Sequence, residues 1–144
     1  MRILVVDDEP DVLLLCRVNL EFAGHEVIDA MDADTGMRAA VDQLPDLVIL
    51  DIMLPRRDGL SMLRELREDS RTANTPVVLL TAKTQGSDQL TGFQSGADEY
   101  ITKPFSPAVL TNTIETVFRM SPEERAGFRN KALAQLSAFR DTPP

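Results

Sequence analysis

Hydrophobic and polar positions follow two alternating patterns along the chain. Short runs rich in Val, Ile and Leu are followed by longer segments in which apolar residues return every three or four positions. The first pattern predicts buried strands and the second predicts amphipathic helices. The predicted strands are Ile3 to Val6, His25 to Asp29, Leu47 to Leu50, Val77 to Leu80 and Tyr100 to Thr102. This alternation is typical of an α/β fold with a parallel sheet.

Five helical segments separate or follow these strands. They are predicted from about Pro10 to a left-handed stop at Gly24, and over Asp34 to Gln43, Gly59 to Asp69, Ser87 to Ser95 and Pro107 to Phe118. Right-handed crossovers between parallel strands place helices on both faces of an open sheet. Ligands of such sheets bind beyond the carboxyl ends of the strands. We therefore expect the functional residues directly after the strands.

A sixth helix is predicted from Pro122 to Phe139. Ser121 can cap its first turn, Pro122 suits the first helical position, and Glu124 completes a capping box. An apolar stripe is expected near one face, while basic residues largely occupy other sides. The stripe comprises Phe128, Ala132, Leu136 and Phe139 with Leu133 beside it, and the basic residues are Arg125, Arg129 and Lys131. The stripe could pack on its own domain, pair with a second copy or bind a partner.

Length and charge limit the possible functions. The chain has 144 residues, 43% of them hydrophobic, which suits one compact domain with a core. We expect this domain over residues 1–120 and a helical extension or linker over residues 121–144. The formal net charge is −8, which argues against direct binding of nucleic acid by this chain.

The single cysteine and the N-terminal residues indicate where the protein works. Cys16 lies in an apolar helical stretch, so a disulfide framework is excluded and a buried thiol in a reducing compartment is the simple interpretation. The apolar run from Met1 to Val6 is too short for a signal peptide or a membrane span. We expect a cytoplasmic protein with no membrane partner.

Polar residues follow four of the five predicted strands. Asp7, Asp8 and Glu9 follow the first strand, Asp51 the third, Thr81 the fourth and Lys103 the fifth. Because the ends of parallel strands converge, the aspartates should form an acidic cluster. At about 5 Å and an effective dielectric near 20, each pair of negative charges repels by roughly 3 kcal/mol. Hard carboxylate ligands with no His or Cys nearby favour Mg²⁺ as the compensating cation.

This constellation is suited to phosphoryl transfer. The Asp51 carboxylate can act as a nucleophile and become an acyl phosphate. The metal, the Lys103 ammonium and the Thr81 hydroxyl could neutralise the phosphoryl oxygens. Each residue also has an ordinary structural interpretation: helix caps for Asp7 to Glu9, a loop carboxylate, a strand-end hydroxyl and an exposed lysine. The order of all these residues after their strands favours the functional interpretation.

The chain resembles the receiver domain of two-component response regulators over about residues 2 to 120. The matching segments are L-V-V-D-D-E-P from Leu4, L-V-I-L-D-I-M-L-P from Leu47, D-G from Asp58, V-V-L-L-T-A from Val77, G-A-D-E-Y from Gly96 and K-P-F from Lys103. The resemblance implies a flavodoxin-like, doubly wound parallel sheet of five strands in the order 2-1-3-4-5 with five helices. The sixth helix would be an addition to this fold.

The resemblance also implies a role for each site residue. Asp51 would accept a phosphoryl group from a sensor histidine kinase or phosphotransfer protein. The Mg²⁺ ligands would be Asp7, acting through water, Asp8, Asp51 and the backbone carbonyl of Met53. Thr81, Ala82 and Lys103 would hold the phosphoryl group, Tyr100 would turn inward, and Pro104 would follow a cis bond. No catalysis is expected beyond the chain's own phosphorylation and dephosphorylation.

Several outputs fit such a domain. The leading hypothesis is a switched protein-interaction surface on the fourth helix, fifth strand and fifth helix, for a downstream protein or a self-dimer. K-P-F-S-P at Lys103 resembles receivers that control winged-helix factors, although the fifth helix has Thr111, Thr113, Glu115 and Thr116 where basic residues and their acidic partners are usual. A receiver fragment of a longer DNA-binding regulator is the alternative. A Mg²⁺-dependent phosphatase would need an aspartate in place of Met53, and a flavin carrier would not suit the acidic first turn.

Overall fold

Five parallel strands form one sheet in a computed structural model that describes residues 1–82 and 91–140. The strands are β1 (Arg2–Val6), β2 (Glu26–Ala30), β3 (Leu47–Asp51), β4 (Val77–Thr81) and β5 (Glu99–Thr102). Their order in the sheet is β2-β1-β3-β4-β5, and every neighbouring pair is parallel. The predicted fold class and strand order are therefore confirmed.

The second strand begins one residue later than the sequence pattern predicts. His25 was expected in this strand, but its backbone N–H donates to the Leu20 carbonyl at 3.0 Å. This bond belongs to the C-terminal turn of α1 (Pro10–Phe22), which Gly24 closes with a φ of 95°. The helix end therefore takes His25 away from the strand.

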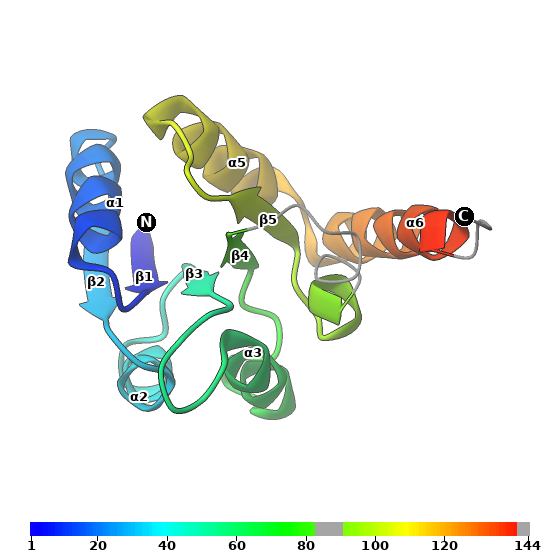
Figure 1. Ribbon diagram of the computed structural model, residues 1–144, viewed down its shortest axis with the longest axis horizontal. Helices are drawn as coiled ribbons and strands as arrows, with labels where there is room; N and C mark the ends of the chain where they lie inside the picture. The colour runs from blue at the N-terminus through cyan, green and yellow to red at the C-terminus, as the bar shows by residue number, and fades with distance from the viewer. Residues whose placement is uncertain (83–90, 141–144) are drawn as a thin grey trace.

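Helices cover both faces of the sheet. Helices α1 and α5 (Pro107–Arg119) lie on one face, and α2 (Ala33–Gln43) and α3 (Gly59–Glu68) lie on the other (Figure 1). Residues 91–94 are helical, and residues 87–90 of the helix predicted from Ser87 to Ser95 lie outside the described residues. Within the described residues, no helix is long and apolar enough to cross a membrane.

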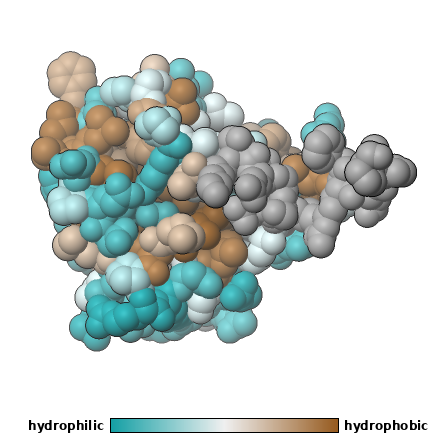
Figure 2. Space-filling model, in the orientation of Figure 1, coloured by the Kyte–Doolittle hydropathy of each residue, from teal (hydrophilic) through white to brown (hydrophobic). Residues whose placement is uncertain are grey.

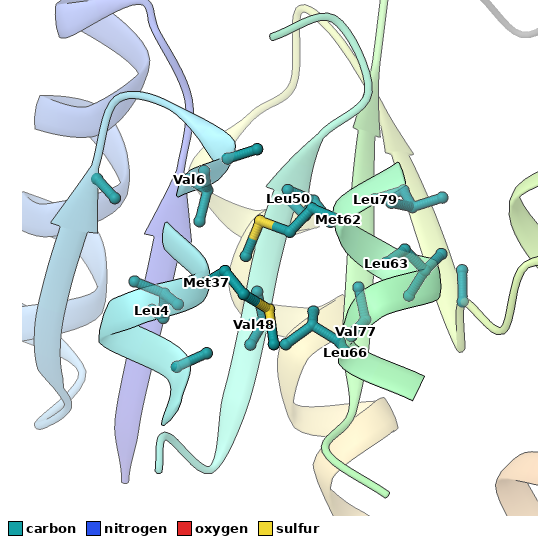
Figure 3. Packing of buried hydrophobic residues seen from close by; sticks show 14 residues of the cluster. Leu4, Val6, Met37, Val48, Leu50, Met62, Leu63, Leu66, Val77 and Leu79 are labelled. Atoms are coloured by element: carbon teal, nitrogen blue, oxygen red, sulfur yellow. The ribbon is translucent and has the colours of Figure 1, made fainter. Parts of the chain in front are cut away.

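Alternate strand residues contribute to two separate hydrophobic cores. On one face, Leu4, Val48 and Val77 pack with Met37 of α2 and Met62 of α3 (Figure 3). The opposite core contains the intervening strand residues with side chains from α1 and α5: Ile3, Val5, Ile49, Leu80, Cys16, Leu20, Leu110 and Ile114. Because both faces are buried, β1, β3 and β4 consist of nearly continuous apolar residues. Cys16 is buried as predicted, and this burial raises the pKa of its thiol to about 12.

Helix α6 (Pro122–Arg140) lies at the β5 edge of the sheet and extends away from it (Figure 1). The predicted capping box is confirmed, because Glu124 N–H donates to Ser121 Oγ and Ser121 N–H donates to Glu124 Oε1, both at 3.1 Å.

The sequence predicts the basic residues of α6 largely on sides other than the apolar stripe, and it does not predict that two of them pack against the domain. Arg125 is buried and Arg129 is half-buried, whereas Phe128 remains 36% exposed. Both arginines lie against the carboxylate of Asp98, an acceptor that the helical periodicity of α6 could not reveal. Ala132, Leu133 and Leu136 are half-buried, and the side chain of Phe139 lies outside the described set.

Candidate functional site

The residues predicted to carry the chemistry meet at the carboxyl edge of the sheet. The pairing of β1 with β3 places Val6 beside Leu50, so the next residues, Asp7 and Asp51, are neighbours. Thr81 ends β4, and Lys103 follows β5. Three parallel strands thus bring two carboxylates and an ammonium group together from distant parts of the sequence.

Four carboxylates gather at this edge. Oxygens of Asp7, Asp8, Glu9 and Asp51 all lie within 4.8 Å of one another. Asp7 is fully buried and Asp51 is 3% exposed, while Asp8 and Glu9 are exposed. The arrangement therefore has a buried floor and an open side from which an ion or a phosphoryl group could enter.

Lys103 compensates part of this negative charge. Its Nζ lies 2.8 Å from Asp7 Oδ2, 2.9 Å from Glu9 Oε1 and 3.0 Å from Asp51 Oδ2. Burial lowers the pKa of Lys103, but the three carboxylates outweigh burial and raise the pKa overall. The ammonium is therefore firmly charged and shared between three acidic partners.

The two buried aspartates have different polar environments. Asp7 Oδ1 accepts a hydrogen bond from the Glu9 backbone N–H at 2.8 Å, whereas its buried Oδ2 has the Lys103 contact without hydrogen-bond geometry. Asp51 Oδ1 accepts from the Met53 N–H at 2.9 Å. Burial raises the pKa of Asp51, and the bonds from Met53 and Lys103 partly oppose this rise.

These oxygens fit a hard divalent cation. The set contains only carboxylates among its side chains, and among the described residues the buried Asp7 Oδ2 has the Lys103 ammonium as its charged neighbour but no hydrogen bond of regular geometry. Asp7, Asp8 and Asp51 could hold such an ion together with the backbone carbonyl of Met53. Met53 projects its side chain into solvent with 70% exposure, so this residue could contribute through its backbone.

The first turn after β1 is not held by side-chain caps. Glu9 occupies the N-cap position of α1, but its side chain makes no cap hydrogen bond and instead contacts Lys103. The capping interpretation of Asp7 to Glu9 therefore does not describe this turn. The sequence placed Glu9 at this edge but assigned it no role in the site, because nothing in the sequence indicates that it would meet a lysine 94 positions later.

The loop from β3 to α3 passes very close to the Asp51 backbone. A Cβ atom on Gly59 would lie 2.0 Å from the Asp51 carbonyl oxygen, so only glycine fits here. Gly59 N–H donates to the Ile52 carbonyl at 2.8 Å. The sequence marked Gly59 only as a helix start, yet it also permits the loop to close under Asp51.

Asp58 caps α3 at the end of this loop, because its Oδ1 accepts from the Ser61 N–H at 2.7 Å. We expect Asp58→Ala to lower the free energy of unfolding by about 1 kcal/mol in urea titration. Glu68→Ala is the matched control, since it removes an exposed acidic residue from the opposite end of α3. The helix dipole disfavours a negative charge there, so this control should not destabilise. Equal losses in both variants would contradict the capping role.

Of the remaining predicted residues, Thr81, Ala82 and Pro104 lie at the same edge, whereas Tyr100 lies inside β5 beside Leu79. Thr81 is 4% exposed and Ala82 is exposed. The peptide bond between Lys103 and Pro104 is cis. Tyr100 is half-buried, and its ring meets Phe93 edge-on with centroids 6.0 Å apart. Phe93 was absent from the predicted site, since this contact joins two elements with no common sequence pattern.

Comparisons with known proteins agree with this geometry. The profile of the response regulator receiver domain matches residues 3–115. The DNA-binding dual master transcriptional regulator RpaA of Synechocystis sp. is 45% identical over 118 residues, which cover 82% of this chain and 49% of RpaA. The chain spans about half the length of the curated relatives it matches.

Solved structures show the same architecture. A putative response regulator from Chloroflexus aurantiacus has a TM-score of 0.79 and 31% identity, with 83% of this chain and 98% of that chain covered. The receiver domain of sensor histidine kinase PA1611 from Pseudomonas aeruginosa has a TM-score of 0.77 and 29% identity, covers 83% and 98%, and contains magnesium in its active-site cleft.

A doubly wound sheet with buried aspartates and a lysine at its carboxyl edge defines a receiver-type signalling domain. The chain belongs to the response regulator receiver domain family.

Proposed function

We propose that this chain accepts a phosphoryl group on Asp51 from a histidine kinase or phosphotransfer protein and thereby switches a protein-interaction surface. The observation that carries the proposal is the environment of Asp51, which is buried beside Asp7 and lies 3.0 Å from the Lys103 ammonium. A carboxylate in this position lies beneath the open side formed by Asp8 and Glu9, and Lys103 supplies a counter-charge for an incoming phosphoryl group.

In the proposed transfer of the phosphoryl group to Asp51, one bond forms and one bond breaks at phosphorus. An Asp51 carboxylate oxygen attacks phosphorus, and the bond from phosphorus to the donor's histidine nitrogen breaks. The electron pair remains on the imidazole, which takes a proton from solvent. Lys103 neutralises one phosphoryl oxygen, and the hydroxyl of Thr81 and the N–H of Ala82 bind the others. Bound Mg²⁺, held by Asp7, Asp8, Asp51 and the Met53 carbonyl, would supply charge neutralisation.

The same proposal assigns the switch to Thr81 and Tyr100. Thr81 moves toward the phosphoryl group, and Tyr100 turns into the space that Thr81 leaves, which changes the surface around β5. The output is a protein contact rather than catalysis on another substrate. Met53 supports this view, because a phosphatase would place a general acid at that position.

An apolar stripe along α1, the helix whose N-terminal end lies at the site, supports a protein as phosphoryl donor. Leu14, Val18 and Phe22 of α1 are 61%, 56% and 94% exposed. Figure 2 shows hydrophobic residues gathered at the upper left, over α1, whereas hydrophilic residues cover the bottom of the molecule. An exposed apolar stripe on a helix that begins at the acidic site suits docking of a donor protein.

A second candidate concerns the output. RpaA is a DNA-binding regulator by its description, and this chain corresponds to about half of its length. The domain over residues 1–120 could therefore act as the receiver part of a DNA-binding regulator in the cytoplasm, with residues 121–144 as extension or linker. The net charge of −8 makes DNA contact by this part itself unfavourable.

The direct test uses acetyl phosphate and Mg²⁺. Intact mass should rise by about 80 Da, the mass of one phosphoryl group. The increase should vanish in Asp51→Asn, because the substituted amide is not a nucleophile, and should vanish in wild type when a chelator removes the metal. Asp46→Asn serves as the matched control, since Asp46 is an exposed aspartate before β3. Labelling that survives in Asp51→Asn would refute the assignment.

A further inference from the structure

Helix α6 binds the rest of the chain through two arginines and one aromatic ring. Arg125 Nη2 donates to the Asn74 carbonyl at 2.7 Å, and Arg129 Nη2 donates to Asp98 Oδ1 at 3.1 Å. The Phe128 ring meets Phe93 edge-on, with centroids 6.4 Å apart. Positions 125, 128 and 129 share one face of a helix. One turn of α6 therefore supplies a charged contact and an apolar contact together.

Asp98 divides its two carboxylate oxygens between the sheet domain and α6. Oδ2 accepts from the Val77 N–H at 2.8 Å and from Arg67 Nη2 at 3.0 Å. Oδ1 faces Arg129 and lies 3.4 Å from Arg125 Nε. The side chain of Asp98 is only 2% exposed. One oxygen of this buried carboxylate thus accepts hydrogen bonds from β4 and α3, and the other contacts the arginines of α6.

The contact between α6 and Asp98 contains more positive than negative charge. Three guanidinium groups surround the single Asp98 carboxylate. Burial lowers the pKa of Arg67, and although Asp98 opposes this, Arg129 and Arg125 lower the pKa further. Within the part of the chain that the structure describes, the buried Nε atoms of Arg125 and Arg129 form no hydrogen bond of regular geometry. Repulsion and desolvation therefore oppose part of the attraction to Asp98, which limits the net free energy that these ion pairs contribute to α6 docking.

Phe93 connects this contact to the phosphorylation site. It is 3% exposed and makes edge-on contacts with Phe128 on one side and Tyr100 on the other. Tyr100 is on β5, three residues before Lys103. A change in the Tyr100 ring must therefore alter the packing of Phe93, and with it the apolar half of the α6 contact.

We infer that α6 is an intramolecular partner of the surface formed by Asn74, Phe93 and Asp98, and that it binds this surface more tightly before phosphorylation than after it. The inference rests on the proposed function, since phosphorylation of Asp51 is what turns Tyr100 inward. Release of α6 then exposes Asp98 Oδ1 and the Phe93 ring. The surface fits a protein helix that presents arginine and an aromatic residue, the chemistry that α6 itself presents.

Hydrogen exchange of the full chain tests the docking. Amides of α6 should exchange roughly tenfold faster in Arg129→Gln than in wild type, the effect expected when one charge-assisted hydrogen bond is lost. Phe128→Ala should act in the same direction through the apolar contact. Lys131→Gln is the matched control, because it removes an exposed positive charge from the same helix and should leave exchange unchanged. Equal exchange in Arg129→Gln, Phe128→Ala and wild type would overturn the inference.

Beryllofluoride with Mg²⁺ tests the coupling. Exchange of α6 amides in wild type should rise when the adduct forms, while Arg129→Gln should respond less because its α6 is already released. Coupling free energies are reciprocal. If the adduct weakens α6 docking, a variant with weakened docking should in turn bind beryllofluoride more tightly than wild type, so we expect a higher affinity in Arg129→Gln. An adduct that leaves α6 exchange unchanged overturns the inference and leaves the proposed function intact. Absence of any adduct on Asp51 refutes the proposed function and the coupling with it, and the variant comparison still decides the docking.

Discussion

Arg67→Met should lower the free energy of unfolding by about 3 kcal/mol, the lower end of the cost of breaking a buried ion pair. Arg67 is on α3, and its side chain is 17% exposed. Its Nη2 donates to the Gly96 carbonyl at 2.7 Å and to Asp98 Oδ2 at 3.0 Å, and its Nη1 donates to the Thr75 carbonyl at 2.6 Å. One guanidinium thus joins α3 to the segments that enter β4 and β5.

The loss is large because the acceptors remain buried. Methionine fills much of the same volume but cannot donate, so the Asp98 carboxylate and two carbonyl groups lose donors that water cannot easily replace. Arg125 and Arg129 still lie beside Asp98, which is why the lower end of the range is expected. Urea titration followed by far-UV circular dichroism measures the change.

Arg64→Met is the matched control for this variant. Arg64 is an exposed arginine on the same helix, so its replacement should change the free energy of unfolding by less than about 0.5 kcal/mol. The double variant Arg67→Met/Asp98→Asn should be less destabilised than the sum of the single variants, because the two side chains interact directly. A loss below about 1 kcal/mol in Arg67→Met, or strict additivity, would contradict a central role for the pair.

The sheet could be predicted from the sequence because its signals are local. Both faces of β3 and β4 are covered, so each appears as an uninterrupted apolar run, and the residues just after these runs are the polar residues of the site. The start of the second strand was predicted one residue too early, because the His25 N–H bonds to the Leu20 carbonyl in the turn that ends α1. Local patterns thus predict the presence of a strand or helix more accurately than the residues at which it begins and ends.

Contacts between distant residues could not be predicted in this way. Asp98 pairs with Arg67, 31 positions away, and Glu9 pairs with Lys103, 94 positions away. Neither pair has a spacing that periodicity can detect. The same reason explains why the burial of Arg129 on α6 could not be predicted. A helical wheel places apolar residues inward, but here a buried carboxylate supplies the partner that attracts an arginine instead.

Lys103→Met should change the two ligand affinities of the acidic site in opposite directions. Lys103 Nζ lies within 3.0 Å of carboxylate oxygens from Asp7, Glu9 and Asp51. At about 3 Å and an effective dielectric near 20, each such pair is worth roughly 5 kcal/mol before desolvation. A divalent cation must weaken some of these contacts in wild type. Without the ammonium, Mg²⁺ should bind about tenfold more tightly, because even a small part of this attraction amounts to a factor of ten.

Phosphorylation should become slower in the same variant. The ammonium neutralises a phosphoryl oxygen as charge develops during transfer, and removal of one such donor typically costs about 100-fold in rate. The expected result is therefore a roughly 100-fold slower gain of the phosphoryl mass with acetyl phosphate, measured at a Mg²⁺ concentration that saturates both proteins. Isothermal titration calorimetry gives the metal affinity independently of the transfer.

The opposite directions distinguish an electrostatic role of Lys103 from a merely structural one. A misfolded site would lose metal binding and phosphorylation together, whereas loss of a single positive charge strengthens the first and weakens the second. Lys131→Met is the matched control, because Lys131 is an exposed lysine on α6, remote in sequence from the acidic cluster, and should change neither quantity. Weaker Mg²⁺ binding in Lys103→Met would show that the ammonium does not neutralise the carboxylates in competition with the metal. An unchanged transfer rate would show that it does not neutralise the phosphoryl group.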